Sequence, residues 1–406
     1  MANLPPPRFL DKSTPPKFLT LIIMAGVSVM IMNMFLPALP AMAEHFGVEY
    51  GVMQLSIVLY LAISGALQLV VGPLSDRYGR RSVVLWGLVI FFVATIGCLL
   101  APNIQLFLFF RSCQAAMVAA MVLSRAVVRD MYDQDNSASM IGYLTMGMAV
   151  IPMMTPAVGG YLSEHLGWQS IFWAFLIVGG AAFALIWSDL GETNQNQSAS
   201  FAEQFRDYPE LLKSPRFWGY VFCAAFSSGG FFAYLGGAPY VGSVVFGLSP
   251  AELGIYFGAP ALGYALGNGF TGRYALRIGI NNMILLGTIL TGLPIMAAAV
   301  LISSGFNTPL VFFGSILVVG FGNGLVMPNA TAGLLSVRPK LAGTASGLGG
   351  AMMIGGGAGM SSLAGHMLEG HDSALPLLFL MLWVTGLGLL SIFGVMFRER
   401  KLRLAS

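Results

Sequence analysis

Residues 72–81 read Gly72-Pro73-Leu74-Ser75-Asp76-Arg77-Tyr78-Gly79-Arg80-Arg81, a concentrated run of charge between two long apolar segments. Charge is scarce elsewhere, because only 9% of the 406 residues are charged while 56% are hydrophobic and the mean hydropathy is +0.78. This composition excludes a soluble globular domain and predicts a chain that crosses a membrane many times. Since a spanning helix needs about 20 apolar residues, we expect about twelve spanning helices.

The apolar segments form two sets of six, which predicts an all-α membrane protein made of two six-helix bundles. The first set occupies residues 18–40, 51–72, 82–101, 104–128, 138–162 and 169–189. The second set occupies residues 217–240, 251–272, 282–303, 309–335, 342–366 and 374–397. We therefore predict a cytoplasmic N-terminal segment (1–17), a first bundle (18–190), a hydrophilic linker (191–215), a second bundle (216–397) and a cytoplasmic tail (398–406).

The cations predict the orientation of these helices. If the N-terminus is cytoplasmic and the spans alternate, the cytoplasmic segments hold all of the 20 Lys and Arg except one. The exception, Arg111, lies inside the fourth span, and the periplasmic turns hold none. Because one missed crossing would scramble every later loop, this bias supports twelve crossings with both termini in the cytoplasm.

The two sets also repeat. Gly72, Arg77 and Gly79 recur 200 residues later as Gly272, Arg277 and Gly279, again between the second and third spans of a set. Leu276 stands where Asp76 stands in the first copy. Parallel repeats of this kind place a substrate site at their interface.

Residues 72–81 resemble the signature loop of the major facilitator superfamily, and several other motifs resemble its bicyclomycin and chloramphenicol resistance (Bcr/CflA-type) drug:proton antiporters. Those motifs are Gln54-Leu55-Ser56, Gln68, Arg125-Ala126-Val127-Val128-Arg129-Asp130-Met131-Tyr132, Gly167-Trp168-Gln169-Ser170-Ile171-Phe172-Trp173, Met327-Pro328-Asn329-Ala330 and Ala342-Gly343-Thr344-Ala345-Ser346-Gly347. The resemblance implies an inner-membrane exporter of small molecules that is driven by proton antiport.

The charged loop has a predicted role in gating. Gly72 and Gly79 are expected to let the chain turn tightly, and Arg77, Arg80 and Arg81 to meet carboxylates or anionic headgroups. The resemblance implies that Asp76 meets the start of the eleventh helix near Gly343 and Thr344, with Arg125 as its cation, and the same gating set includes Arg129 and Asp130. The alternative is a loop that sets topology and has no switching role.

The fifth span contains Pro152-Met153-Met154-Thr155-Pro156-Ala157-Val158-Gly159-Gly160, which resembles the antiporter motif of the superfamily. Pro152 and Pro156 remove helical hydrogen-bond donors, while Gly159 and Gly160 permit close packing on a neighbour. We expect the fifth span to be a bent helix that acts as a hinge and packs tightly enough to prevent leakage through the transporter. Ordinary packing of small residues is the alternative.

Arg111 is the leading candidate for substrate binding or coupling, since a cation within a span is costly. It lies where antiporters of this superfamily have an arginine on the fourth helix, and Gln114 follows it. The first-span motif resembles that of the branch, except that Asn33 stands where the branch usually has Asp. By depth we expect Asn33 to lie across the cavity from Arg111, where an amide can hydrogen-bond but cannot titrate.

Further pocket residues are expected among flexible and aromatic side chains, chiefly Met34, Tyr234 and Tyr256, although packing is the more common fate of such residues. With Arg111 and no acid near mid-membrane, the pocket is expected to prefer neutral or anionic amphipathic compounds, such as phenicols, to lipophilic cations. Proton coupling is in question because Asn33 replaces an Asp.

The sequence predicts no enzyme, since no metal-ligand cluster, nucleophile arrangement or nucleotide-binding loop is present. The three cysteines have no metal spacing. We expect no cofactor and no nucleic-acid partner, and we expect a monomer in the lipid bilayer that binds small molecules and protons. Two alternatives stay open: a metabolite uptake protein or facilitator, and a ligand-binding receptor or scaffold without net transport.

Overall fold

The computed structural model describes residues 6–132, 134–194, 211–338 and 342–405, and these residues form helices and connecting turns without a strand. The first half contains α1 (Phe18–Asn33), η1 (Leu36–Ala38), α2 (Leu39–Phe46), α3 (Tyr50–Tyr78), α4 (Arg80–Leu100), α5 (Ile104–Cys113), η2 (Gln114–Met117), α6 (Val118–Met131), α7 (Gln134–Leu166) and α8 (Gln169–Asp189). The second half contains α11 (Pro215–Tyr240), η3 (Val241–Val245), α12 (Pro250–Tyr256), α13 (Gly258–Ile278), α14 (Ile280–Ser303), α15 (Pro309–Ser336), α16 (Ala342–Leu368) and α17 (Leu375–Ala405).

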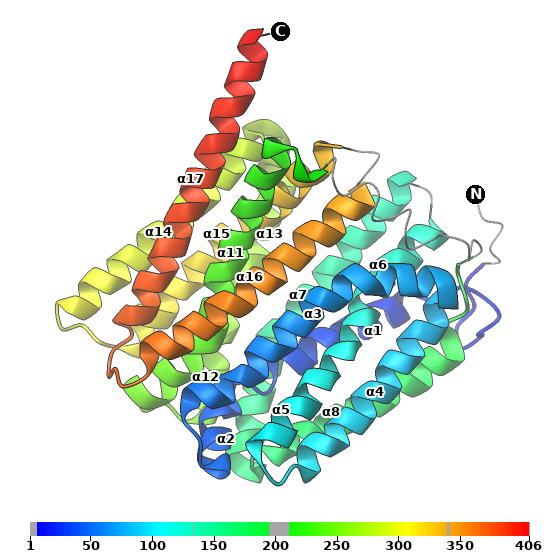
Figure 1. The fold of residues 1–406 in the computed structure, drawn as a ribbon, viewed down its shortest axis with the longest axis horizontal. Coiled ribbons are helices and arrows are strands. Elements are labelled where there is room, and N and C mark those ends of the chain that lie inside the picture. Colours follow the sequence, from blue (N-terminus) through cyan, green and yellow to red (C-terminus); the bar gives the residue numbers. More distant parts are fainter. Residues whose placement is uncertain (1–5, 133, 195–210, 339–341, 406) are drawn as a thin grey trace.

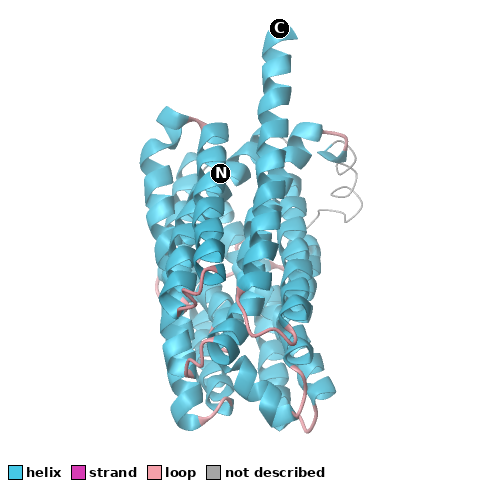
Figure 2. Ribbon diagram, turned by 90° about the vertical axis from the view of Figure 1, so that its left-hand side faces the viewer, coloured by secondary structure: helices cyan, strands magenta, loops and turns pink. Residues whose placement is uncertain are grey.

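The number of spanning helices agrees with the prediction. Nine helical segments of the described chain are long and apolar enough to cross a membrane. The long helices α7, α13 and α16 complete a set of twelve that runs along a common direction (Figures 1 and 2). The predicted all-α, twelve-helix membrane fold is confirmed.

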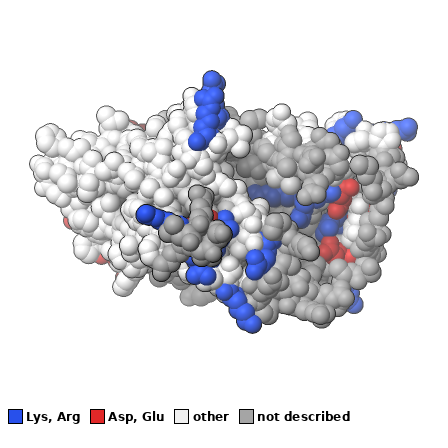
Figure 3. Space-filling model, turned by 90° about the horizontal axis from the view of Figure 1, so that it is seen from above, with Lys and Arg blue, Asp and Glu red and all other residues white. Residues whose placement is uncertain are grey.

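Both chain termini lie toward the same end of the bundle, which we call the terminal face (Figures 1 and 2). The opposite end is the distal face. Seen from above, the terminal face shows more Lys and Arg than Asp and Glu, and these cations lie over the middle and right of the view (Figure 3). The excess of Lys and Arg that the sequence predicts for the cytoplasmic side is therefore present on this face.

The two halves pack through a few helices. Helix α3 of the first half packs along α16 of the second, and α7 packs against α12 and α13. The remaining helices mostly contact neighbours in their own half, as α14 and α15 do. The interface between the halves is thus a pair of helix seams.

The predicted loop at 72–81 is shorter in the structure. Helix α3 continues through Pro73 to Tyr78, Gly79 is the only residue between helices, and α4 begins at Arg80. Gly79 has φ +89°, in the left-handed region that favours glycine, whereas Gly72 lies inside α3 with open space where a side chain would begin. The prediction that Gly72 forms a turn is wrong, because Gly79 alone provides the reversal.

Three of the predicted spans are interrupted within the described chain, and one of them is the eighth, where Phe257 separates α12 from α13. The first span comprises α1, η1 and α2, and the break falls beside Pro37, which has no backbone N–H to continue the helix. The fourth comprises α5, η2 and α6, with the break directly after Cys113. At the other end of the chain, α17 continues as helix to Ala405, so the predicted tail at 398–406 begins as an extension of the last span.

Asp189, at the end of α8, anchors the N-terminal segment. Its carboxylate is fully buried and accepts hydrogen bonds from the backbone N–H of Leu10 (2.6 Å), the backbone N–H of Lys17 (2.9 Å) and the Thr20 hydroxyl (2.6 Å). Lys17 precedes the first residue of α1, so the carboxylate lies at the positive end of that helix. Residues 6–17 are therefore fixed to the first half.

Candidate functional site

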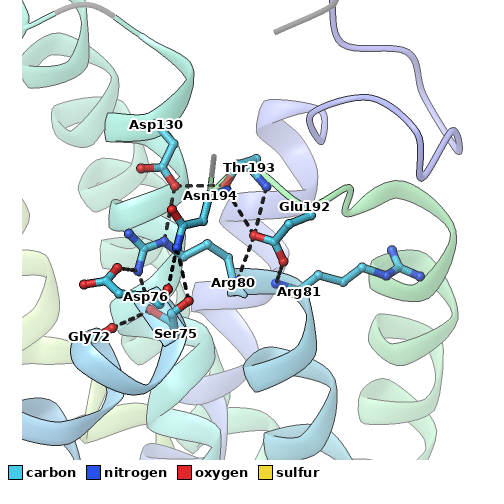
Figure 4. Close-up of polar contacts among 9 residues, drawn as sticks. All are labelled: Gly72, Ser75, Asp76, Arg80, Arg81, Asp130, Glu192, Thr193 and Asn194. Carbon is cyan, nitrogen blue, oxygen red and sulfur yellow. Dashed lines mark hydrogen bonds and ion pairs between the residues drawn. The ribbon is translucent and has the colours of Figure 1, made fainter. Parts of the chain in front are cut away.

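A charge cluster lies on the terminal face around the α3–α4 junction, and we define it as Asp76, Arg80, Asp130 and Glu192 (Figure 4). Arg80 is its centre. Its guanidinium contacts Asp76 through Nη1 (2.6 Å) and Asp130 through Nε (3.2 Å), and Nη1 also donates to Ser75 Oγ. One arginine thus joins α3, α4 and α6.

Glu192 completes the cluster from the stretch that the sequence predicts to be a linker. Its carboxylate accepts from the backbone N–H of Arg80 (2.9 Å) and of Arg81 (3.2 Å), at the unpaired N-terminal donors of α4. Thr193 donates its hydroxyl to Asp130 (2.9 Å). Sequence reasoning missed these residues, although two acids close together at the end of the sixth span, Asp189 and Glu192, were an available signal.

Asp76 has a different ion partner from the predicted one. The structure pairs it with Arg80, which follows one turn later across Gly79, and Arg125 makes no ion pair with it. The contacts of Gly343 and Thr344, its other predicted neighbours, lie outside what the structure describes. The prediction of Arg125 as its cation is wrong because Arg80 is already within ion-pair distance in the adjacent turn.

The other cations of the gating set lie around the cluster. Arg81 donates to the carbonyls of Trp187 (2.7 Å) and Leu190, and its side chain extends away from Arg80 (Figure 4). Arg77 lies over the Tyr78 ring at 5.3 Å. Arg125 and Arg129 are both exposed on α6.

A set of contacts at the distal face holds the two halves together, and we call it the distal gate. Tyr50 OH donates to the Gly236 carbonyl (2.8 Å), Gln54 Nε2 to the Ser361 carbonyl (2.7 Å) and the Ala251 N–H to Glu164 (3.0 Å). No hydrogen bond between two described residues joins the halves at the terminal face. The hydrogen bonds between described residues of the two halves are therefore confined to the distal face.

The antiporter motif lies on α7 beside this gate. A Cβ at Gly159 would overlap the Met34 carbonyl, and one at Gly160 would overlap the Pro250 carbonyl of the other half. Pro152 and Pro156 lie within α7, which remains continuous, and Gly254 lies against the Pro156 carbonyl. Glycine at 160 and 254 permits the backbones of the two halves to touch, while Gly159 permits close packing of α7 on the first span of its own half.

The Arg111 centre comprises Arg111, Gln114, Phe35, Tyr60 and the Ile31 carbonyl. Arg111 is 1% exposed. Its Nη1 donates to Gln114 Oε1 (2.6 Å) and its Nη2 to the Ile31 carbonyl (3.0 Å), while the guanidinium carbon lies 4.0 Å from the Phe35 ring centre and 4.6 Å from that of Tyr60. The Nε–H is buried without a partner among the described residues.

The buried guanidinium of Arg111 is stabilised without a carboxylate from any described residue, and it keeps its net charge. Helix α1 ends at Asn33, so the Ile31 carbonyl belongs to its last turn, whose carbonyls have no helical donor and form the negative end of the helix. Two aromatic faces add cation–π attraction. Gln114 is itself held by a hydrogen bond from its Nε2 to Thr95 Oγ1 (2.8 Å). The break in the first span thus leaves a helix-end carbonyl free to stabilise the guanidinium, in the place that a buried carboxylate would otherwise take.

Asn33 does not hydrogen-bond Arg111. Its Nδ2 donates to the Val29 carbonyl of its own helix (2.8 Å), although it lies only two residues beyond the carbonyl that Arg111 contacts. The prediction that Asn33 pairs with Arg111 is wrong, because Asn33 Nδ2 donates to the Val29 carbonyl while Arg111 Nη1 and Nη2 donate to Gln114 and the Ile31 carbonyl. Met34, the next residue, is buried against Gly159.

Tyr234 and Tyr256 belong to an aromatic cluster of the second half. Tyr234 is 1% exposed, its hydroxyl has no partner within the described chain, and its ring lies 5.3 Å from that of Phe257. Tyr256 is half-buried and stacks on Phe313 at 4.7 Å. Neither lies on the same helices as Arg111, so the structure does not bring these predicted pocket residues together in one set of contacts.

The family of the chain is shown by its similarity to known proteins. The family description of the Major Facilitator Superfamily matches residues 21–362, most of the chain. This chain is a member of the Major Facilitator Superfamily. The predicted resemblance of the chain to the superfamily is confirmed.

Several superfamily members are similar to it over most of their length. "Uncharacterized MFS-type transporter YdgK" of Bacillus subtilis is 30% identical over 371 residues, 89% of this chain and 91% of that protein. A "Chloramphenicol resistance protein" of Pseudomonas aeruginosa is 32% identical over 318 residues, 77% of this chain and 75% of that one. A "Bicyclomycin resistance protein homolog" of Haemophilus influenzae is 28% identical over 380 residues, 91% and 94%.

A solved transporter structure shares the fold. It is a bacterial homolog of the human lysosomal transporter Spinster in an inward-facing and occupied conformation. It aligns with a TM-score of 0.69 over 94% of this chain and 96% of its own, at 17% identity. The likeness supports the fold alone.

Proposed function

We propose that this superfamily member exports small amphipathic compounds, neutral or anionic, across the inner membrane by alternating access. Relatives named for chloramphenicol and bicyclomycin resistance support the substrate class. The observation that carries the proposal is the Arg111 centre, where a buried cation has no carboxylate from the described chain. In a low-dielectric site such a charge attracts anions and neutral acceptors and repels lipophilic cations.

The distal gate supports a state that is closed at one end. With the terminal face in the cytoplasm, as the positive-inside rule indicates, the gate closes the periplasmic side. Export then requires this gate to break while the terminal-face helices come together. We further propose a monomer, because one chain contains both halves of the pathway.

A transport panel tests the substrate class. The purified chain is reconstituted in proteoliposomes and assayed with chloramphenicol as a neutral phenicol, a bile-acid anion and tetraphenylphosphonium as a lipophilic cation. We expect transport of the first two and none of the third. Strong tetraphenylphosphonium export without phenicol transport would overturn the proposal.

The variants Arg111→Gln and Arg111→Lys test whether the Arg111 centre is responsible for the transport of anionic substrates. We expect Gln to abolish transport of the anion, while Lys, which keeps the charge but loses the guanidinium fork, retains part of it. Arg273→Gln, which removes an exposed cation from the terminal face, serves as the matched control and should leave transport unchanged. Equal transport by Arg111→Gln and the unaltered chain would show that the Arg111 centre plays no part in transport.

Proton coupling is the second part of the proposal. Asn33 cannot titrate, so we propose that the chain moves fewer protons with each substrate than an Asn33→Asp variant does. A pH-sensitive dye inside the proteoliposomes measures this flux. Equal proton flux in both chains would reject impaired coupling, while loss of substrate accumulation on adding an uncoupler would separate an exporter from a facilitator. Counterflow of labelled substrate would exclude a receptor without transport.

A further inference from the structure

A groove opens between the first turns of α11 and the last turns of α17, at the membrane-facing side of the terminal face. Its volume is about 570 Å³, and the residues that line it come from these helices and the short turn before α11. They include Trp218, Phe222, Leu390 and Phe397 on its walls and Lys213 and Arg398 at its terminal-face end. The groove lies away from the Arg111 centre and from the charge cluster.

Glycines on both helices produce the groove. A Cβ at Gly219 would overlap the Val395 side chain, so α11 and α17 approach closely at this level. On the other wall, a Cβ at Gly394 would meet nothing within 4 Å, which leaves open space beside the close approach. The groove is therefore a property of the backbone packing and needs no rearrangement to form.

The walls are apolar and open to the bilayer. Phe222 is 38% exposed, Phe397 61% and Leu390 69%. Leu390 and Arg398 are eight residues apart on α17, which is about 12 Å along a helix axis at roughly 1.5 Å per residue. That length accommodates the first part of an acyl chain.

The mouth is cationic. Lys213 and Arg398 are both exposed, and neither makes an ion pair within the described chain. Arg216 beside them differs, because it pairs with Glu399 at 2.8 Å. The groove therefore presents, above an apolar wall, two positive charges that form no ion pair with another described residue.

Trp218 marks the level of the membrane interface. Its indole N–H donates to the Leu212 carbonyl (2.7 Å), which fixes the ring at the boundary between the apolar wall and the cations. Tryptophan is enriched at this level of membrane proteins because its ring is amphipathic. The order from the terminal face inward is thus cations, indole, then apolar wall, which is the order of a phospholipid.

We propose that this groove binds an anionic glycerophospholipid of the adjacent leaflet. Lys213 and Arg398 hold the phosphate and headgroup, and one acyl chain lies along Phe222, Gly394 and Leu390. Basic pockets between membrane helices recognise anionic headgroups in this way. The inference is independent of the compound that is transported.

The test compares lipids with identical acyl chains. The full chain in detergent is titrated with dioleoyl phosphatidylglycerol or dioleoyl phosphatidylcholine, and bound lipid is counted by native mass spectrometry. We expect the unaltered protein to retain phosphatidylglycerol. The double variant Lys213→Gln with Arg398→Gln should bind it about thirtyfold more weakly, because it removes two surface cations that contribute on the order of 1 kcal/mol each. Arg273→Gln with Arg277→Gln removes two exposed cations elsewhere on the same face and should leave the titration unchanged.

Two further arms identify the acyl contribution. Gly394→Trp fills the groove and should weaken phosphatidylglycerol binding while both cations remain. Glycerophosphoglycerol, which has the headgroup without chains, should not displace the lipid. Equal retention of the two lipids, equal loss in the control pair, or full retention by the Lys213 and Arg398 double variant would each overturn the proposal.

Discussion

At the scale of single residues, Arg111 shows how a membrane protein stabilises a buried cation without an acid. Its partners are a helix-end carbonyl, an amide oxygen and two aromatic faces. Each of these is a dipole or quadrupole, so the centre retains its net charge. A substrate that supplies negative charge or a strong hydrogen-bond acceptor therefore gains the interaction energy with the Arg111 guanidinium that an internal carboxylate would otherwise have taken up.

Replacing Gln114 with Glu should cancel that advantage. The new carboxylate would lie at the position of the Oε1 atom that is now 2.6 Å from Arg111 Nη1 and would neutralise the guanidinium. We expect kcat/KM for an anionic substrate in proteoliposomes to fall about tenfold or more, equivalent to about 1.4 kcal/mol. Thr95→Val, which removes the hydroxyl that holds Gln114 without adding charge, is the control. An unchanged rate for Gln114→Glu would contradict this role of the charge.

Asp189→Asn should lower thermal stability. The carboxylate accepts three hydrogen bonds in a fully buried position, and an amide replaces one acceptor oxygen with a donor that faces an N–H group. A hydrogen bond to a charged group contributes about 1.5–3 kcal/mol, so we expect a clear fall in the apparent Tm measured by tryptophan fluorescence. Asp11→Asn changes an exposed acid in the same N-terminal segment and should shift it much less. Equal shifts would show that Asp189 is not the anchor.

At the scale of secondary-structure elements, the junction of α3 and α4 depends on a single residue. Gly79 reverses the chain at φ +89°, and a side chain there would also meet the Glu192 carboxylate that caps α4. Gly279 has nearly the same φ, +85°, but a Cβ there would meet nothing within 4 Å. The two copies of the repeat therefore share the turn and differ in what is packed against it.

Alanine substitutions at Gly79, Gly279 and Gly72 separate the conformational cost of the turn from the cost of displacing Glu192. Gly79→Ala should be the most destabilising, because it adds the displacement of Glu192 to the cost of the left-handed conformation, about 1 kcal/mol or more. Gly279→Ala should show the conformational cost alone, and Gly72→Ala, in the interior of α3, should be neutral or stabilising by up to about 1 kcal/mol. The apparent Tm of the three variants measures this order. A strong destabilisation by Gly72→Ala would restore the predicted turn at that position.

The elements show where sequence reasoning succeeded. Apolar length and the cation count predicted twelve spans, since both follow from the bilayer rather than from contacts. The end of α3 was misplaced by six residues, from 72 to Tyr78, because Pro73 and the charges of the next turn read as a loop while the helix continues at the membrane surface. The ion pair of Asp76 with Arg80 and the cap by Glu192 depend on which turns meet in space, and a single sequence does not specify that.

At the scale of the whole molecule, the hydrogen bonds between described residues of the two halves lie at the distal face. The gate contains three hydrogen bonds between the halves and two glycines, Gly160 and Gly254, at which the backbones touch. A side chain at either glycine would hold the halves apart at this end.

Gly160→Leu should therefore favour opening of the distal face. A single cysteine introduced at Gln54, inside the gate, should react faster with a membrane-impermeant thiol reagent applied from the periplasm, in a background with Cys98, Cys113 and Cys223 replaced. Gly269→Leu, at a glycine where a Cβ would meet nothing within 4 Å, provides the control. Equal labelling rates in the two leucine variants would show that the close approach at Gly160 does not hold the gate.

The Arg111 centre also has a consequence for biosynthesis. Ile31, Phe35 and Tyr60 all leave the ribosome before Arg111, and Gln114 follows only three residues later. The most expensive side chain of the membrane interior thus enters the bilayer after the helix end and aromatic rings that stabilise it, and no residue of the second half is required. The first half is able to insert its buried cation during its own synthesis, before any helix of its pseudo-symmetric partner has been made.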